Sequence, residues 1–216
     1  MTEFPLHGLY AITDSTLMPN TDSLLLQVEQ ALRGGAHIIQ YRDKSNDQTL
    51  RLQQAIALVD LCQQYQRPIL INDDTQLAKA SGADGVHLGQ GDGNIEDARA
   101  YLGATAIIGN TCHNSLPLAH SAYQQGADYV AFGALFPSST KPDATLAPMS
   151  LIREAKATLP VPVVAIGGIN MDNADQVISA GADMIAVIHN LFANDDICAQ
   201  AGQFNALFNC SAHDTN

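Results

Sequence analysis

Polar and charged residues follow several short apolar runs of this chain, and their types point to the chemistry of anions and metal ions. Two such groups are Gln40-Tyr41-Arg42-Asp43-Lys44 and Asn72-Asp73-Asp74, and the single charged residues Asp92 and Lys141 stand in comparable places. One or two carboxylates, completed by phosphate oxygens and water, form the usual Mg²⁺ site. Arg and Lys bind the remaining phosphate oxygens. These residues therefore predict a diphosphate bound through Mg²⁺, with Asp73 and Asp92 as the protein ligands.

A second anion site is indicated further along the chain. Gly167-Gly168-Ile169 follows one apolar run, and Ile188-His189-Asn190 follows the next. Because glycine has no Cβ, backbone N–H groups at such positions can approach a phosphate closely. A diphosphate at the first site and a monophosphate at the second would place two substrates face to face.

The same residues also have structural interpretations, which the sequence leaves open. Asn72-Asp73-Asp74 has the composition of a helix N-cap, and Asp92 precedes a glycine as a turn residue would. Gly167-Gly168 suits a tight turn, and Lys141 stands in a polar, Pro-flanked segment where it could be solvated. The prediction of a site therefore depends on whether the fold brings these residues to one face.

An internal repeat indicates the elements that must position these residues. A Gly-Ala pair, an acidic residue or histidine, and an apolar run occur four times, at Gly35-Ala36-His37-Ile38-Ile39, Gly82-Ala83-Asp84-Gly85-Val86, Gly126-Ala127-Asp128-Tyr129-Val130 and Gly181-Ala182-Asp183-Met184-Ile185. Each copy follows an amphipathic stretch. Its glycine suits the end of a helix, because glycine accepts the left-handed conformation. The apolar run after it has the pattern of a buried strand.

Strands and helices are predicted to alternate along the whole chain. Further apolar runs lie between the copies, at 8–12, 68–71, 106–109 and 162–166, and helical patterns separate them at 23–33, 48–65, 75–80, 95–102, 116–124, 151–159, 174–180 and 197–208. Alternating units of this kind imply a parallel sheet with right-handed crossovers. The 216 residues predict an α/β fold, a single (β/α)8 (TIM) barrel domain over residues 1–216, with an open doubly wound sheet as the alternative. Chemistry in such a barrel lies at the carboxyl ends of the strands.

Composition excludes several kinds of partner. The formal net charge of -12, from 22 acidic against 10 basic residues, repels nucleic acid and anionic lipid, and no stretch has the roughly 20 apolar residues of a membrane helix. The first residues lack the basic start of a secretory signal. Four cysteines without a CxxC motif predict reduced thiols and a cytoplasmic protein. The polar segment 211–216 is expected to fray, and the sequence leaves open whether the chain forms a homo-oligomer.

The motifs resemble those of the thiamine-phosphate synthase family. The set is highly specific and extends over nearly the whole chain in order, whereas any one motif alone would be weak. It consists of Tyr10-Ala11-Ile12-Thr13-Asp14, Gln40-Tyr41-Arg42-Asp43-Lys44, Asn72-Asp73, Gly85-Val86-His87-Leu88-Gly89-Gln90 with Asp92, Gly109-Asn110-Thr111-Cys112-His113, Gly126-Ala127-Asp128-Tyr129-Val130, Ser138-Ser139-Thr140-Lys141 and Ala165-Ile166-Gly167-Gly168-Ile169. The resemblance implies a transferase that joins 4-amino-2-methyl-5-hydroxymethylpyrimidine diphosphate to a thiazole phosphate, giving thiamine phosphate and diphosphate.

The resemblance also implies roles for individual residues. The pyrimidine diphosphate would be held by Gln40, Tyr41, Arg42, Asp43, Lys44, Asn72, Thr111 and Lys141, of which Arg42, Lys44 and Lys141 would be catalytic. The thiazole phosphate would be held by Ser138, Ser139, Thr140, Gly168, Ile188 and His189. Asp73 and Asp92 would bind Mg²⁺. The family is thought to use a dissociative displacement, in which the aminopyrimidine stabilises a benzylic-type cation.

The chain departs from the family pattern at a few positions. His189 and Thr111 stand where the family has serine, Ser138 stands for threonine, and Ala134 stands for proline. Thr111 keeps the hydroxyl group. The other changes concern the predicted thiazole pocket, so they affect that pocket more than the diphosphate end.

Three other functions remain alternatives at this point. The related thiazole tautomerase uses the same scaffold but needs no Mg²⁺ or diphosphate site. His113 favours it, while the set of Asp73, Asp92, Arg42 and Lys141 argues against it. A non-catalytic barrel that binds thiamine precursors is the second. A different phosphate-binding barrel isomerase or aldolase is the third, although an aldolase would need a lysine on an inner strand, and the later strands carry none before Lys141.

Overall fold

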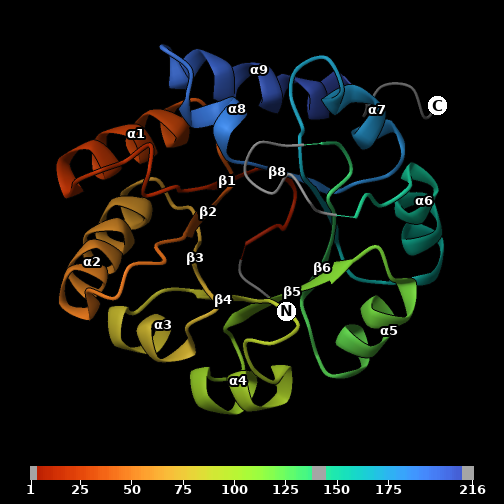
Figure 1. Ribbon diagram of the computed structural model, residues 1–216, viewed down its shortest axis with the longest axis horizontal. Helices are drawn as coiled ribbons and strands as arrows, with labels where there is room; N and C mark the ends of the chain where they lie inside the picture. The colour runs from red at the N-terminus through yellow and green to blue at the C-terminus, as the bar shows by residue number, and fades with distance from the viewer. Residues whose placement is uncertain (1–3, 138–144, 211–216) are drawn as a thin grey trace.

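Eight short strands run parallel and close into a barrel inside a ring of helices (Figure 1). The structure is a computed structural model that describes residues 4–137 and 145–210. The strands pair in chain order and are β1 Gly8–Ile12, β2 Ile38–Tyr41, β3 Ile69–Asn72, β4 Gly85–Leu88, β5 Ile107–His113, β6 Tyr129–Phe132, β7 Val163–Ile166 and β8 Met184–Val187. Because β1 also pairs with β8, the prediction of a single (β/α)8 barrel is confirmed and the open sheet is wrong.

Helices follow the strands and cover the outside of the barrel. They are α1 Thr21–Arg33, α2 Gln48–Gln64, α3 Thr75–Ser81, α4 Ile95–Leu102, α5 Leu116–Gln124, α6 Met149–Thr158, α7 Ala174–Ser179, α8 His189–Phe192 and α9 Ile197–Cys210. Each predicted helix is present, with small differences at its ends. Helix α8 was not predicted, because a helix of 4 residues is too short to show a helical period.

Local sequence explains where these helices begin and end. Asn20 begins α1 with a capping box, in which its side chain accepts a hydrogen bond from the Ser23 backbone N–H at 2.9 Å. Such a cap satisfies an N–H group that has no partner within the helix. The repeat glycines follow helices with positive φ, at Gly35 (94°), Gly82 (75°), Gly126 (94°) and Gly181 (105°). The expectation that they occupy left-handed positions is confirmed.

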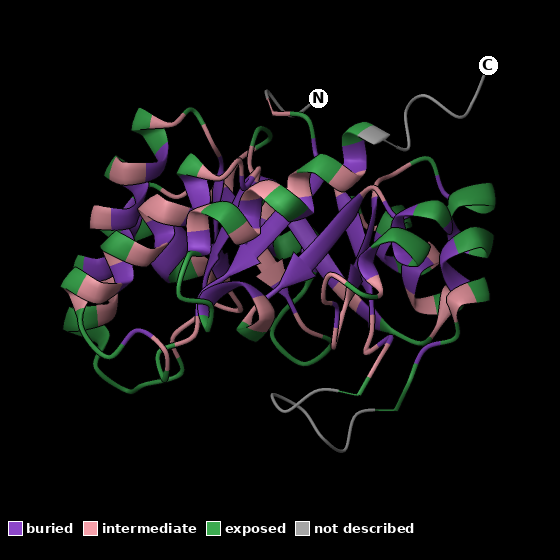
Figure 2. Ribbon diagram, turned by 90° about the horizontal axis from the view of Figure 1, so that it is seen from above, coloured by how far each residue is buried: buried purple, intermediate pink, exposed green. Residues whose placement is uncertain are grey.

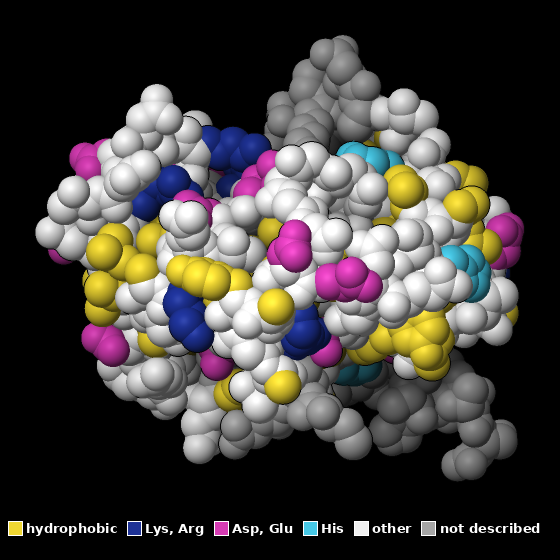
Figure 3. All heavy atoms as spheres, turned by 90° about the horizontal axis from the view of Figure 1, so that it is seen from below, with side chains coloured by type: hydrophobic (Ala, Val, Ile, Leu, Met, Phe, Trp, Pro, Cys, Tyr) yellow, Lys and Arg dark blue, Asp and Glu magenta, His cyan; other side chains and the backbone are white. Residues whose placement is uncertain are grey.

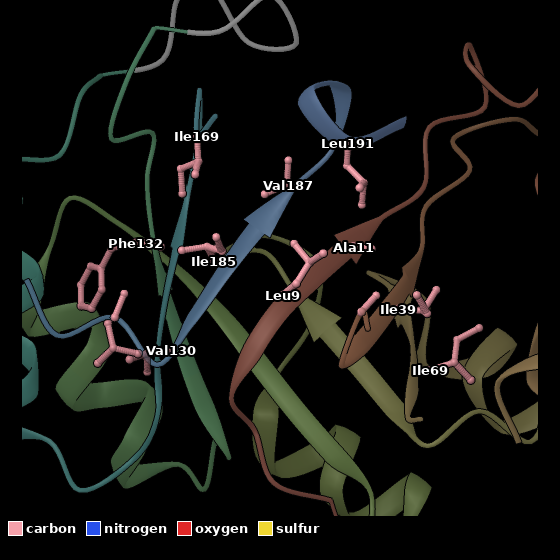
Figure 4. Packing of buried hydrophobic residues seen from close by; sticks show 14 of the residues in the cluster. Leu9, Ala11, Ile39, Ile69, Val130, Phe132, Ile169, Ile185, Val187 and Leu191 are labelled. Carbon is pink, nitrogen blue, oxygen red and sulfur yellow. The ribbon is translucent and has the colours of Figure 1, made fainter. Parts of the chain in front are cut away.

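The hydrophobic core has two parts, one on each face of the strands. Alternate residues such as Tyr10, Ile38 and Met184 point into the barrel lumen and form the inner cluster. Their neighbours, such as Leu9 and Ile39, point outward against the helices. Figure 2 shows the buried strands between helices whose outer faces are exposed, and Figure 4 shows the outward residues of several strands. Burial on both faces explains why the strands are continuous apolar runs.

The repeat aspartates form hydrogen bonds and ion pairs at the amino-terminal end of the barrel. Each accepts a hydrogen bond from a backbone N–H near the start of the preceding strand: Asp84 from Ile69 (2.8 Å), Asp128 from Ile108 (2.7 Å) and Asp183 from Val163 (2.8 Å). Asp128 and Asp183 also form ion pairs with Arg99 and Lys156. In the remaining repeat His37 takes the place of the aspartate and packs against Gly8, where a Cβ would lie 2.5 Å from its Nδ1.

The length and apolarity of the described helices can be compared with those of a membrane span, and two of the cysteine thiols are buried. Within residues 4–137 and 145–210, no helix is both long and apolar enough to cross a membrane. Figure 3 shows acidic and basic side chains interspersed over one side of the molecule. Cys62 and Cys112 are free and buried, and burial raises the pKa of Cys112 to about 12. Both thiols therefore stay protonated at neutral pH.

Candidate active site

Two carboxylates meet at the carboxyl end of the barrel. Asp73 follows β3, Asp92 lies in the loop after β4, and their side chains are within hydrogen-bond reach of each other. Gly89 makes room for them, because a Cβ at this position would lie 2.3 Å from Asp92 Oδ2 and 3.9 Å from Asp73 Oδ1. A side chain at position 89 would displace the Asp92 carboxylate. The two predicted metal ligands, 19 positions apart in the numbering of the chain, thus come together.

The backbone holds Asp73 in an unusual conformation. Its φ is +64°, a left-handed position that costs a residue other than glycine roughly 1–2 kcal/mol. The Asp73 N–H donates to the His87 carbonyl oxygen at 2.8 Å, and Asn72 Nδ2 donates to Asp73 Oδ2 at 2.5 Å. The next residue, Asp74, caps α3 by accepting from the Leu77 N–H at 2.9 Å. The N-cap interpretation is therefore correct for Asp74, while Asp73 is turned toward Asp92.

The pair of carboxylates is electrostatically suited to a cation. Partial removal from water raises the pKa of Asp92, the negative charge of Asp73 raises it further, and the charge of Lys44 opposes both effects. Among the described residues, no group of three or more His, Cys, Asp or Glu side chains could hold a metal. Two carboxylates nevertheless fit Mg²⁺, because this ion keeps several water or phosphate ligands. A divalent ion would also remove the repulsion between the two carboxylates.

Basic side chains lie beside this pair. Lys44 Nζ is 3.8 Å from Asp73 Oδ2, and Arg51 forms an ion pair of 3.1 Å with Asp74. Lys44, Arg51, Asn72 and Asp73 line an open cleft of about 480 Å³. The Lys44 side chain is 65% exposed, so it is free to move toward an anion in this cleft.

Arg42 follows β2 and is hydrogen-bonded to the end of β1. Thr13, which follows β1, accepts a hydrogen bond from the Arg42 N–H at 2.9 Å. Burial alone would raise the pKa of Asp14, but hydrogen bonds from Thr16 and the positive charges of Arg42 and His189 outweigh burial and lower this pKa. Arg42 and His189, which belong to the two predicted anion sites, therefore both act on one carboxylate at the mouth of the barrel.

A line of hydrogen bonds crosses the lumen of the barrel. Gln40 Nε2 donates to Tyr10 Oη at 2.6 Å, and Tyr10 Oη lies 2.8 Å from Tyr129 Oη. His87 Nδ1 lies 2.9 Å from Tyr129 Oη, and His87 Nε2 lies 2.8 Å from Thr111 Oγ1. Burial raises the pKa of both tyrosines, so both remain protonated. We call these five side chains the lumen chain; its two ends, Gln40 and Thr111, are predicted substrate-binding residues.

Two predicted substrate-binding residues form hydrogen bonds within the protein. Tyr41 is buried outside the barrel, where its hydroxyl donates to Gln54 Oε1 of α2 at 2.7 Å. Asp43 accepts a hydrogen bond from the Ser45 N–H at 2.7 Å. The structure therefore places Tyr41 in the core, whereas Asp43 lies in a loop turn that also lines the cleft beside Lys44. Alternation along a strand sends neighbouring residues to opposite faces, which is why Tyr41 faces the helices while Gln40 faces the lumen.

The glycines after β7 make a tight contact with the loop after β6. Gly168 has a φ of +66°, and a Cβ there would lie 2.5 Å from the Pro137 carbonyl oxygen. The tight-turn interpretation of this glycine pair therefore holds. Ile188 caps the short helix α8, which begins at His189, and Asn190 Nδ2 donates to the Ile169 carbonyl oxygen at 2.7 Å. The loops after β7 and β8 are thus joined, as the second anion site requires.

Four predicted site residues have no described position. Ser138, Ser139, Thr140 and Lys141 lie outside the described residues. Their predicted roles, in binding the thiazole phosphate and the diphosphate, remain predictions.

The residues between the ends of the lumen chain were not predicted as part of a site. Tyr10, His87 and Tyr129 stand in the family motifs, but the sequence assigned no role to them. The available signal was Gly109, one strand away from Tyr129: a Cβ at Gly109 would lie 1.9 Å from Tyr129 Cζ. A glycine in a short buried strand indicates that another group approaches closely.

The closed barrel with charged side chains gathered at the carboxyl ends of its strands has the architecture of a (β/α)8-barrel enzyme. The family model described as thiamine monophosphate synthase matches residues 9–191. A thiamine-phosphate synthase of Saccharophagus degradans is 56% identical over 191 residues, 88% of each chain. One of Nitrosococcus oceani is 54% identical over 203 residues, 94% of this chain and 93% of the relative.

A solved structure agrees with these relatives. The thiamine phosphate pyrophosphorylase of Pyrococcus furiosus superposes with a TM-score of 0.85 at 34% identity, over 94% of this chain and 96% of the other. The chain therefore belongs to the thiamine monophosphate synthase family, and it is a transferase with thiamine-phosphate synthase activity. The comparisons do not support the alternative of a thiazole tautomerase.

Proposed function

We propose that the chain joins an aminopyrimidine methyl diphosphate to a thiazole phosphate at the mouth of the barrel, with release of diphosphate. The observation that carries this proposal is the carboxylate pair Asp73–Asp92, which lies beside Lys44 and a basic cleft. A doubly charged ion and a diphosphate complement this mixture of acidic and basic side chains. The family relationship supports the same reaction.

Asp73 and Asp92 would hold Mg²⁺, and the family relationship supports this ion as the cofactor. When bound, the ion neutralises charge that develops on the departing diphosphate. The protein prepares the ion's place by holding Asp73 in a left-handed conformation and by leaving no side chain at Gly89. Both carboxylates can then face the same ion without competing for space.

The basic residues would bind the diphosphate oxygens. Lys44 reaches from the loop after β2, and Arg42 and Asn72 approach from the ends of β2 and β3. Lys141 would join them from the segment after β6. These positive charges stabilise charge on the leaving oxygen. Gln40 would position the pyrimidine from within the lumen, and Thr111, at the other end of the lumen chain, would bind the diphosphate.

The thiazole phosphate would lie against the loops after β6, β7 and β8. Gly168, Ile188 and His189 belong to the joined loops, and Ser138, Ser139 and Thr140 would add hydroxyl donors. The charge of His189 acts at Asp14 close to Arg42, which supports two anionic substrates that lie next to each other. Asp43 would act only indirectly, by shaping the loop that carries Lys44.

The reaction needs no general base at the nucleophile. The thiazole nitrogen attacks as a neutral atom, and the aminopyrimidine can stabilise a benzylic-type cation after the diphosphate leaves. The protein therefore contributes charge stabilisation and positioning, rather than proton abstraction. Small-molecule substrates are the partners of this function, and its acidic surface and reduced thiols suit the cytoplasm.

A diphosphate-release assay tests the proposal. The wild-type protein, given both substrates and Mg²⁺, is expected to release diphosphate and form thiamine phosphate, whereas the Asp73→Ala variant is expected to lose nearly all of this activity. Asp60→Ala is the matched control, since Asp60 is an exposed carboxylate of α2. Wild-type protein without diphosphate release, or an Asp73→Ala variant with full activity, would contradict the proposal.

A further inference from the structure

The middle of the lumen chain has no part in the function described so far. Tyr10, Tyr129 and His87 come from β1, β6 and β4, and they join Gln40 of β2 to Thr111 of β5 through four hydrogen bonds of 2.6–2.9 Å. Both tyrosines are buried, at 1% and 0% exposure. The burial of polar groups at such depth costs free energy unless they are hydrogen-bonded. This cost favours an ordered set of hydrogen bonds in the lumen chain.

The direction of these hydrogen bonds follows from their Gln40 end. An amide Nε2 can only donate, so the Tyr10 oxygen accepts from Gln40. The Tyr10 hydrogen then points to Tyr129, its other partner in the described structure. The opposite direction would leave the Tyr10 hydrogen buried without an acceptor, which costs about 1–3 kcal/mol.

The same reasoning fixes the tautomer of His87. Because Tyr129 accepts from Tyr10, the Tyr129 hydrogen is donated to His87 Nδ1. A neutral imidazole that accepts at Nδ1 carries its hydrogen on Nε2. His87 Nε2 therefore donates to Thr111 Oγ1. The hydroxyl hydrogen of Thr111 is then directed away from His87, and among the described residues no hydrogen bond uses it.

We propose that Tyr10, Tyr129 and His87 are positioning residues that orient the Thr111 hydroxyl as a hydrogen-bond donor to an anionic oxygen of the substrate. This inference rests on the proposed function, which places a diphosphate near Thr111. It adds that the donor is oriented before the substrate arrives. A hydroxyl that already points outward avoids the loss of rotational freedom that binding would otherwise require.

The negative charge of a diphosphate agrees with this direction of the hydrogen bonds in the lumen chain. In the opposite tautomer, His87 would carry its hydrogen on Nδ1. Thr111 would then donate its hydroxyl hydrogen to His87 Nε2 and present an oxygen lone pair to the substrate. A lone pair would repel a diphosphate oxygen. The ordered lumen chain therefore favours an anion at Thr111 and disfavours a hydrogen-bond donor there.

The tautomer of His87 can be measured without any substrate. We expect ¹⁵N NMR of wild-type protein labelled at histidine, at a pH where imidazole is neutral, to show His87 with a protonated Nε2 and an unprotonated, hydrogen-bonded Nδ1. Comparison with a His87→Gln variant assigns the signal. A His87 that carries its hydrogen on Nδ1 would overturn the inference.

Removing the central hydroxyl provides the kinetic test. The Tyr129→Phe variant is expected to raise KM for the pyrimidine diphosphate about tenfold, the effect of one hydrogen bond to a charged group, and to leave KM for the thiazole phosphate unchanged. A loss of structure alone would lower the fraction of active enzyme, and hence kcat, without changing KM. Tyr65→Phe is the control, because Tyr65 donates to Glu29 outside the barrel.

A double-mutant cycle shows whether the effect passes through Thr111. Thr111→Val is expected to raise the same KM by about 10- to 100-fold in the wild-type background and by clearly less in the Tyr129→Phe background. Thr111→Ser should restore the wild-type KM. Independent, additive effects of Tyr129→Phe and Thr111→Val would overturn the inference.

The two hypotheses fail in different ways. If wild-type protein releases no diphosphate, the proposed function is wrong, whatever the NMR result for His87. If it releases diphosphate but His87 is protonated on Nδ1, only the ordered lumen chain is wrong. If it releases diphosphate, Nε2 is protonated and the cycle shows coupling, the inference is supported.

Discussion

Aspartates lie at both ends of the barrel, and their partners differ. At the amino-terminal end, Asp128 accepts from the Ile108 N–H at 2.7 Å and pairs with Arg99 at 2.6 Å. At the carboxyl end, Asp73 and Asp92 face each other, and Lys44 Nζ lies 3.8 Å from Asp73 Oδ2. The first kind of carboxylate is neutralised within the protein, whereas the second kind repels its neighbour.

This difference in partners predicts that the first kind of carboxylate contributes to the stability of the fold and that the second kind contributes to activity. A carboxylate with a backbone N–H and a guanidinium as partners needs nothing from outside, so its removal should destabilise the fold. The negative charge of Asp73 raises the pKa of Asp92, so the two carboxylates repel each other unless a cation is bound. On the proposed function, removal of either carboxylate should affect activity and leave the fold intact. We therefore expect identical residue types at opposite ends of one barrel to have opposite roles.

The largest expected effect is the loss of activity on substitution of Asp73. Asp73→Ala should lower kcat about 10³-fold, at the upper end of the range for one group that stabilises a charged transition state, while the free energy of unfolding without Mg²⁺ stays equal or rises. Steady-state kinetics and denaturant unfolding measure the two quantities. A strongly destabilised Asp73→Ala protein would remove the distinction between the two ends.

The next effect concerns the basic side of the mouth. Lys141→Ala should lower turnover about 10²-fold with a much smaller change in KM for the thiazole phosphate, because its proposed partner is the departing diphosphate. Lys79→Ala, in the last turn of α3, is the control. Equal effects of Lys141→Ala on turnover and on thiazole phosphate binding would contradict this assignment.

The amino-terminal end should show the opposite behaviour. Asp128→Ala removes the acceptor of the Ile108 N–H and the ion-pair partner of Arg99, which keeps its hydrogen bonds to backbone carbonyl oxygens such as that of Gly126. The substitution should lower the free energy of unfolding by about 1–3 kcal/mol. The kcat of the remaining folded enzyme should stay close to the wild-type value. Denaturant unfolding and active-site titration measure both quantities. A large fall in kcat with unchanged stability would show that this end also contributes to activity.

The smallest effect concerns the pH dependence of stability. The pKa of Asp92 is raised in the folded protein, so the folded state binds this proton more tightly than the unfolded state. Stability from this group therefore increases as the pH falls through the raised pKa, and ionised Asp92 is unfavourable at neutral pH. Asp92→Asn should raise Tm slightly at pH 7 with a chelator present, and this gain should shrink at acidic pH. A lower Tm at pH 7 would contradict the repulsion.

Sequence patterns predicted most of the fold because the relevant forces are local. The repeat glycines marked helix ends, since few other residues accept a positive φ, and the apolar runs marked strands buried on both faces. Helix α8 was not predicted, because a helix of 4 residues is too short to show a helical period. Closure of the barrel depends on the pairing of β1 with β8, which alternating units favour without requiring it.

The site was predicted less completely, because the types and spacing of residues do not show where each side chain points. Asp73 and Asp74 are neighbours of the same type, yet one turns to Asp92 and the other caps α3. The run from Gln40 to Lys44 was predicted as one binding motif, but strand alternation sends Tyr41 to the outer core. The lumen chain escaped prediction, because its five members come from five different strands.

The sequence by itself determined the order of the elements, the ends of most helices and the residue types available at the mouth. These features depend on burial periodicity and local conformational preference, which act over a few residues. Only the tertiary structure decided which carboxylates face each other, which are neutralised by a backbone N–H, and which hydroxyls align across the lumen. Those outcomes depend on distances between strands remote in the chain, and such distances exist only once the barrel has closed.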